Sequence, residues 1–402
     1  MANSAETPNI PHLNHSVLDL PLNEATKTTI SRALWDHNTI PSTTQRLYSS
    51  KPHINLNPYF HYYTKQCQHA LHDGGRHVAT RTHADIISCT AMLKSDMSRA
   101  DIHTSLHSKL TSSHPNASEM ISNSIDLSAS LLLMTNFGSY SYGFSGKNCL
   151  SWGSPPQPQA SCQPEPQPQS LRSFLRTYFT PPPSSSSSYG SPHPDNHTKL
   201  EKIFKASNLS RIANLSVTWT DNLADHLRLT DDDTRVHIFH HASFLQAQNQ
   251  ETCLFPPGLV EETLNTLALL FPSSDLETKR WLDGILPTLK NGRTDGEAGE
   301  IDMRVTQCGR LKTDDRQIDR FRFWRDRLVM LKQVFDEAQP KTIRQWWYDS
   351  RNGVQWYTFW VAVMVLVLTV VFGLIQSVEG ALQVYASFRG ITHNGGEGGG
   401  GE

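Results

Sequence analysis

The densest group of side chains with metal-binding chemistry lies near the middle of the chain. It comprises the carboxylates and imidazoles of Asp231, Asp232, Asp233, His237, His240 and His241. Carboxylate oxygens and imidazole nitrogens are common ligands of divalent metals, so this group is a candidate site for a metal-dependent enzyme. On a strand, His237 and His241 would share one face and His240 would point the other way. The aspartates fall in a predicted turn, where Asp bonds to its local backbone. We favour a turn followed by a strand end, and assign no catalytic, cofactor-binding or metal-binding residue.

Other motifs that could carry chemistry are excluded by their spacing. Asp73-Gly-Gly-Arg76 and Ser145-Gly-Lys147 lack both the GxxxxGK[ST] spacing and the preceding apolar strand of a phosphate loop. No GxSxG or HExxH motif occurs. The six cysteines form no CxxC pair, which favours free thiols in a reducing compartment: Cys67, Cys89, Cys149, Cys162, Cys253 and Cys308. We therefore expect no cofactor.

The elements around the Asp/His group predict a mainly helical domain at 199–350 that contains a small strand pair. Leu215, Val217 and Trp219 alternate with polar residues, as in a half-buried strand, and a second strand is expected at 236–239. A helix from Leu259 should stop at Pro272. The longest soluble helix is expected at 314–338, where apolar residues repeat almost as heptads. This pattern favours packing within its own domain and leaves homo-oligomer formation open.

The first half of the chain predicts three further segments. Residues 1–58 should be mostly disordered, apart from a short helix at 22–36, and 59–137 should form a helical unit. Thr82 and Asp85 resemble a helix-capping box within that unit. Residues 138–198 are rich in Pro and Ser and predict a linker or insertion, with one short helix at 171–179 that docks back.

An uncharged stretch near the C-terminus, residues 354–375, predicts a transmembrane helix. Its length as a helix is about 33 Å, enough to cross a hydrocarbon core of about 30 Å. Trp356, Tyr357 and Trp360 gather at one end, where aromatic side chains favour the headgroup layer. The alternative, a buried core helix, is disfavoured because core helices of this length usually carry a polar face. Residues 376–402 form a short tail.

Charges around this helix predict the topology. The N-terminus has no basic patch followed by an apolar run, so it does not resemble a secretory signal. Three basic residues precede the helix closely, at 341, 344 and 351, whereas Arg389 alone follows it. The positive-inside tendency then places the N-terminal part in the cytosol of a single-pass, tail-anchored protein. Five glycosylation sequons argue for the opposite orientation: Asn14, Asn116, Asn196, Asn208 and Asn214.

Three stretches of the chain carry a family resemblance. They are WTDNLADHLRLTDDDTRVHIFHHA at 219–242, LVEETLNTLALLFP at 259–272, and NGVQWYTFW from Asn352 with GLIQSVEGALQVY from Gly373. Together they resemble a family of uncharacterised filamentous-fungal proteins with a single C-terminal transmembrane helix. The resemblance covers 199–388 closely and about 80–137 more loosely. It implies a topology and no specific activity. In a fungus, such a protein would suit a role in the cell surface, hyphal morphology or self-recognition.

These observations give one main expectation and one alternative. The fold should be mainly α with a small β pair, followed by one transmembrane helix. A net charge of −2 gives no overall basic bias towards nucleic acid. We expect a membrane-anchored, non-enzymatic protein-interaction module that contacts the bilayer through its C-terminal helix and an unidentified protein through its helical domain. The alternative is a membrane-tethered metal-dependent enzyme that uses the group from Asp231 to His241.

Overall fold

The computed structural model divides the chain into two compact units, Met1–Ala338 and Gln339–Glu402. It describes residues 17–35, 54–109, 115–138, 148–153, 169–180, 199–249, 252–290, 301–339, 342, 345 and 353–394. The protein is mainly helical with one small sheet and one long apolar helix near the C-terminus, which confirms the expected fold class. The predicted disorder at 1–16 and 37–53, and most of the Pro/Ser-rich segment, lie outside the described residues.

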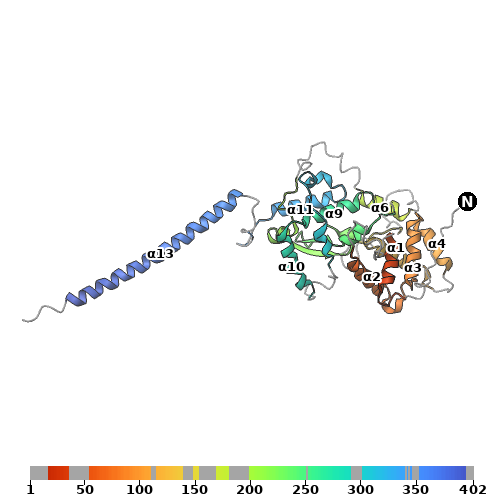
Figure 1. The fold of residues 1–402 in the computed structure, drawn as a ribbon, viewed down its shortest axis with the longest axis horizontal. Helices are drawn as coiled ribbons and strands as arrows, with labels where there is room; N and C mark the ends of the chain where they lie inside the picture. Colours follow the sequence, from red (N-terminus) through yellow and green to blue (C-terminus); the bar gives the residue numbers. More distant parts are fainter. Residues whose placement is uncertain are drawn as a thin grey trace, which may run out of the picture. The chain divides into compact units, whose positions relative to one another are not determined.

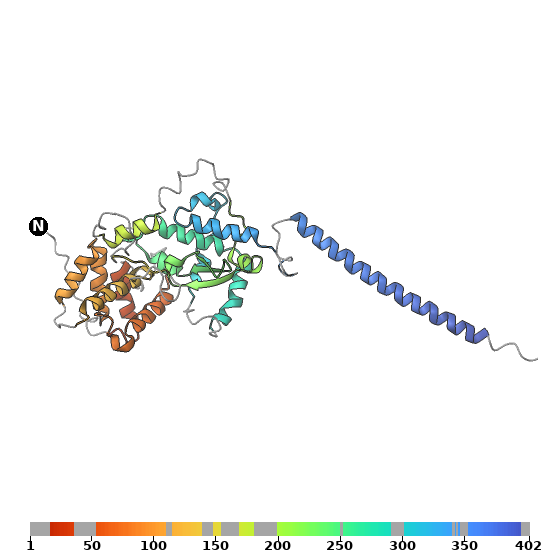
Figure 2. The same ribbon diagram turned by 180° about the vertical axis from the view of Figure 1, so that it is seen from behind.

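The first unit begins with a group of helices, which Figures 1 and 2 show at one end of that unit. The α-helices are α1 (Glu24–Trp35), α2 (Asn57–Ala70), α3 (His83–Lys94), α4 (Arg99–Lys109), α5 (Ala117–Leu133) and α6 (Leu171–Phe179), and the 3-10 helix η2 spans His72–Gly75. Helices α2, α3 and α4 all pack against α5. Helix α3 starts where Thr82 and Asp85 form the predicted capping box.

The second half of this unit surrounds the sheet. Its strands are β1 (Ser216–Thr220), β2 (Leu229–Thr230) and β3 (Arg235–Phe239). Its α-helices are α7 (Ala206–Arg211), α8 (Ala242–Ala247), α9 (Leu259–Leu270), α10 (Leu276–Lys290) and α11 (Arg325–Glu337). Short 3-10 helices lie between them: η5 (Leu223–Asp225), η6 (Met303–Gln307), η7 (Asp314–Arg316) and η8 (Ile318–Arg320).

The sheet has three strands in the order β1-β3-β2. Strands β1 and β3 are parallel, in a register that places Ser216 opposite Arg235 and Thr220 opposite Phe239. The two-residue strand β2 is antiparallel to β3. The predicted pair is therefore present, and a third short strand accompanies it. Because parallel strands point the same way, the residues that follow β1 and β3 meet at one edge of the sheet.

An aromatic cluster joins the two helical segments, 59–137 and 199–350, that the sequence predicts as separate units. The ring of Trp35 lies 4.6 Å from that of Tyr59 and 5.5 Å from that of Phe244, and both contacts are edge to face. These rings come from α1, α2 and α8, and all three residues are buried. Helices before residue 137 and after residue 199 thus share one core, and both lie in the first compact unit.

Helix α6 lies inside the segment expected to be a linker, and it docks as predicted. Leu171, Leu175 and Phe179 recur at a spacing of four residues and are all buried. The Phe179 ring contacts Trp324, with 6.1 Å between centroids. On the same helix, Arg172 Nη1 donates a 3.0 Å hydrogen bond to the Cys253 carbonyl. This part of the segment belongs to the folded unit.

The helix expected at 314–338 is shorter than predicted. Only α11, Arg325–Glu337, is α-helical, and the two 3-10 turns η7 and η8 precede it. The buried carboxylate of Glu262, on α9, accepts backbone N–H bonds of 2.8 Å from residues 322, 323 and 324. An upstream extension of the helix would use these N–H groups for its own backbone bonds, but they donate to the carboxylate instead, which also lies near the positive end of the helix. The contact explains why α11 begins at Arg325.

The described part of the second unit includes the long unbroken helix α13 (Gly353–Asn394), drawn in blue in Figure 1. It has 42 residues and continues well past the predicted end at Ile375. The stretch 356–389 is long and apolar enough to cross a membrane, and none of it is buried against the rest of the described protein. Its large apolar side chains are exposed along its length, from Val354 to Phe388. A lipid environment would remove this surface from water.

Candidate functional site: a buried aspartate and two histidines

The structure places the predicted aspartates in a solvent-exposed turn. Asp231, Asp232 and Asp233 connect β2 to β3, with left-handed φ angles of 54°, 51° and 59°. Asp tolerates this conformation because its side chain bonds locally. Asp231 forms a 3.0 Å ion pair with Arg235, and His237 Nε2 lies 3.0 Å from Thr230 Oγ1. Asp231 and His237 are therefore paired with residues of the hairpin itself.

A different acid meets two of the predicted histidines. Asp221, His240 and His241 place their ligand atoms within 4.8 Å of one another, the one such group of three found among the described residues. The expectation that His240 and His241 point to opposite faces is wrong. Strand β3 ends at Phe239 and α8 begins at Ala242, so strand alternation does not extend to these two residues.

The parallel strands explain how this group forms. Asp221 directly follows β1, and His240 and His241 directly follow β3. Their shared edge of the sheet is where ligands bind in many open parallel sheets. Sequence reasoning missed Asp221 because it treated the strands as a pair without orientation. The available signal was a polar residue immediately after each of two apolar strands.

Both imidazoles approach a single carboxylate oxygen. Asp221 Oδ1 lies 3.2 Å from His240 Nε2 and 2.7 Å from His241 Nε2. The two rings are 4.0 Å apart between centroids and 31° from parallel. Both histidines are 2% exposed and the Asp221 side chain is 26% exposed. Trp219 packs edge to face against His240, and Tyr62 lies beside His241. The group is thus a buried hydrogen-bonded cluster with one edge towards solvent.

The hydrogen bonds around His240 fix its tautomer. The backbone N–H of Asp302 donates to His240 Nδ1 at 3.3 Å, so this nitrogen carries the lone pair. In a neutral imidazole the proton then sits on Nε2, which donates it to Asp221. A metal bound at Nε2 would need the lone pair there, and the proton would move to Nδ1, facing the Asp302 N–H. The cluster therefore fits a metal poorly, although its residue types would suit one.

The ionisation of the cluster follows from the same contacts. Burial alone would raise the pKa of Asp221, but the hydrogen bonds from His240 and His241 outweigh it and hold this pKa well below its usual range. Burial lowers the pKa of His241 to about 4, with neighbouring His240 contributing to the decrease. At neutral pH Asp221 is therefore a carboxylate and His241 is neutral. His241 Nδ1 is buried and has no hydrogen-bond partner among the residues described.

The residues around the cluster hold neighbouring elements together and line none of the described cavities. Asp302 accepts a 2.6 Å hydrogen bond from the Ser243 N–H at the start of α8 and a 3.0 Å bond from the Arg304 N–H in η6. Neither the cavity beside Lys202 and Arg316 nor the small one beside Trp35 is lined by a member of the cluster. The arrangement joins the ends of β1 and β3 to α8 and η6.

The cysteines and the glycine-rich turn offer no alternative chemistry. The five cysteines that the structure describes are free thiols, and Cys162 lies outside the described residues. Burial raises the pKa of Cys67 and Cys308 to about 12, so these thiols stay protonated and are weak nucleophiles. At Gly75, φ is 72° and a Cβ would lie 2.1 Å from Arg81 Nη1, so the glycine makes room for a side chain of the protein.

Comparisons with known proteins identify no relative of this chain. No protein-family model matches the chain, and no curated protein or solved structure gives a significant match.

Proposed function

We propose that the protein is a single-pass, tail-anchored membrane protein that holds a non-enzymatic helical domain at the cytosolic face of a bilayer, where the domain binds a protein partner. The observation that carries this proposal is the contrast between the two units. The first buries its large aromatic and aliphatic residues, whereas α13 exposes apolar side chains along more than 30 residues. In water such a surface would be a strong aggregation hazard, whereas in lipid it is satisfied.

The site chemistry supports a non-enzymatic role. An active site needs polar groups that converge on a space open to substrate. Asp231 to Asp233 instead lie on an exposed turn, and Asp221 already accepts hydrogen bonds from both buried imidazoles. A protein-interaction role agrees with the family resemblance, which suggests work at the fungal cell surface, in hyphal morphology or in self-recognition.

The cluster of Asp221, His240 and His241 keeps the metal-dependent enzyme as a second candidate. It brings together one carboxylate and two imidazoles, the ligand types that zinc and iron prefer. Calorimetric titration of the full chain in neutral detergent with Zn²⁺ separates the two candidates. We expect no binding heat, because His240 Nε2 carries a proton. Heat that Asp221→Asn abolishes would favour the enzyme.

Carbonate extraction of cell membranes tests the anchor. The full chain should stay in the pellet. Val365→Arg with Leu368→Arg places two charges in the middle of the predicted span, at a cost of about 3 kcal/mol each, and should move the protein to the supernatant.

Tyr385→Arg with Phe388→Arg provides the matched control for this experiment. It adds the same two charges beyond the predicted span at 354–375, where long side chains can reach the headgroups. This variant should remain in the pellet. Recovery of the unsubstituted chain in the carbonate supernatant would contradict the membrane anchor.

A further inference from the structure

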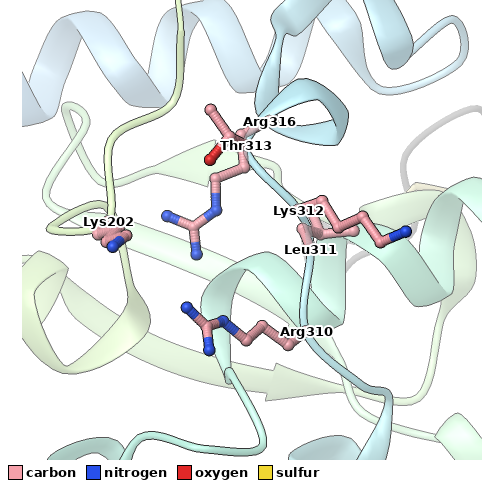
Figure 3. A pocket seen from close by; sticks show the side chains of 6 residues that line it. All are labelled: Lys202, Arg310, Leu311, Lys312, Thr313 and Arg316. Atoms are coloured by element: carbon pink, nitrogen blue, oxygen red, sulfur yellow. The ribbon is translucent and has the colours of Figure 1, made fainter.

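A cationic cavity lies in the first unit, away from the Asp/His cluster. Its volume is about 360 Å³, and it is lined by Lys202, Arg310, Leu311, Lys312, Thr313 and Arg316. Figure 3 shows the guanidinium groups of Arg310 and Arg316 directed into the same space, with Lys202 at the edge of that space. Lys312 points away from the other three cations in this view. Three positive groups therefore converge from two segments that are far apart in sequence.

Among the residues that the structure describes, no carboxylate lines this cavity. Asp314 and Asp315 are close in sequence, but both are exposed and neither is among its lining residues. In the described part of the chain, Lys202, Arg310 and Arg316 form no ion pair with an acid. Lys202 and Arg310 are exposed, so water screens much of the repulsion among the three charges, whereas Arg316 carries its charge in a buried position. A bound anion would compensate the charge of Arg316 most.

Arg316 is the most constrained of the three cations. It is only 6% exposed, and its Nη1 is buried without a hydrogen-bond partner among the described residues. Burial lowers the pKa of its guanidinium group, and the charge of Arg310 adds to this decrease. The backbone holds Arg316 in place, because its carbonyl accepts a 2.8 Å hydrogen bond from the Leu200 N–H. A buried, unpaired guanidinium is costly, which indicates a missing partner.

We propose that Lys202, Arg310 and Arg316 form a binding site for a phosphate group, carried by a soluble phosphorylated metabolite or by a lipid headgroup. Arginine forks match the oxygens of phosphate in pairs, and lysine adds a point charge. Two arginines and a lysine suit a doubly charged anion better than a single carboxylate. The cavity volume is within the range of small-molecule sites and leaves room for a ring attached to the phosphate.

Titration of the full chain in neutral detergent with inorganic phosphate and with inositol 1,4,5-trisphosphate tests the site. Binding should raise Tm by a few degrees at saturating ligand and should weaken with added salt. Arg310→Gln and Lys202→Gln should each weaken the binding of inositol trisphosphate about tenfold or more. Lys312→Gln removes the same charge from the same segment and should change Kd less than about threefold, because its ammonium group points away.

Arg316→Met separates a ligand-binding role from a structural one. Without ligand, this variant should have an equal or higher Tm than the unsubstituted chain, because it removes a buried charge with no partner on Nη1. It should also lose the rise in Tm with phosphate. A lower Tm in the absence of ligand, with the phosphate response intact, would assign Arg316 to the fold and overturn the proposal.

The Kd of inositol trisphosphate for the full chain, measured in nanodiscs of two lipid compositions, tells whether the natural phosphate ligand is a lipid or a soluble molecule. One set contains phosphatidylcholine alone, and the other adds about 5% phosphatidylinositol 4,5-bisphosphate. If the lipid is the natural ligand, it will occupy the site in the second set and weaken the binding of inositol trisphosphate about tenfold. If the ligand is soluble, the two sets will give the same Kd. Failure of both phosphate probes to bind below about 10 mM in detergent would overturn the site itself, whether or not the anchor is correct.

Discussion

At the level of single residues, three buried histidines couple this fold to pH. His83, His226 and His241 are each at most 2% exposed. Burial lowers the pKa of His226 to about 3 and that of His83 and His241 to about 4. An unfolded histidine has a pKa of about 6.5, so protons bind the unfolded chain first. The contribution of these neutral histidines to the free energy of unfolding is therefore fully present above about pH 6.5 and decreases as the pH falls towards 4. Protonation of each histidine in the unfolded chain lowers the free energy of unfolding by about 2 kcal/mol between pH 7 and pH 5.

His226→Gln should reduce this acid sensitivity. The ring accepts a 3.2 Å hydrogen bond from the Phe239 N–H at Nδ1, so Nε2 donates to Thr266 Oγ1 at 2.7 Å. Glutamine can supply an acceptor and a donor without binding a proton. We expect the loss of unfolding free energy between pH 7 and pH 5 to shrink by about 2 kcal/mol in denaturant titrations of the full chain. His61→Gln, at an exposed position of α2, should leave this loss unchanged. If the unsubstituted chain, His226→Gln and His61→Gln all lose the same unfolding free energy between pH 7 and pH 5, His226 is not a source of the acid sensitivity.

The sequence revealed the residue types of the candidate cluster but not its membership. Asp231 to Asp233 stand beside the histidines in sequence, and the turn that they form was predicted correctly. Asp221 joins His240 and His241 only because β1 and β3 run parallel. The cationic cavity was also missed, because Lys202 and Arg310 are brought together by the fold and share no local motif.

At the level of elements, prediction succeeded where the decisive interactions are local. The capping box at Thr82, the end of α9 before Pro272 and the apolar stripe of α6 all depend on residues within a few positions of one another. The start of α11 depends instead on Glu262, about 60 residues earlier in the chain. Helical periodicity continued upstream of Arg325, but the backbone N–H groups there bind the carboxylate of another helix.

Glu262→Gln should weaken the start of α11. Its two carboxylate oxygens accept three backbone N–H bonds, and an amide would turn donor hydrogens towards those groups. We expect a loss of about 2–3 kcal/mol in the free energy of unfolding of the full chain. Hydrogen exchange at residues 322–324 should become faster. Glu261→Gln, at the exposed neighbouring position on α9, should cost less than about 0.5 kcal/mol. Similar losses in the two variants would show that Glu262 does not cap α11.

At the level of the whole molecule, the sequons and the basic residues predict opposite orientations, and the structure adds an argument. Asn208 is buried in α7, where its side-chain amide donates a 2.8 Å hydrogen bond to the Ile203 carbonyl. A glycan on this amide is incompatible with that contact. Asn116 and Asn214 are exposed, whereas Asn14 and Asn196 lie outside the described residues. Asn208 therefore has a structural role in α7, and its sequon gives no information on the orientation of the chain.

Glycan mapping in eukaryotic cells tests the orientation of the full chain. With the N-terminal part in the cytosol, no natural sequon should be modified, and endoglycosidase should leave the protein mass unchanged. Gly396→Thr creates a sequon at Asn394, beyond the predicted span, and should add an endoglycosidase-sensitive glycan because the tail is then lumenal. Gly396→Ala creates no sequon and serves as the control. If the unsubstituted chain instead loses mass on digestion, and Asn116→Gln or Asn214→Gln removes that loss, the domain faces the lumen. A cytosolic partner would then be excluded.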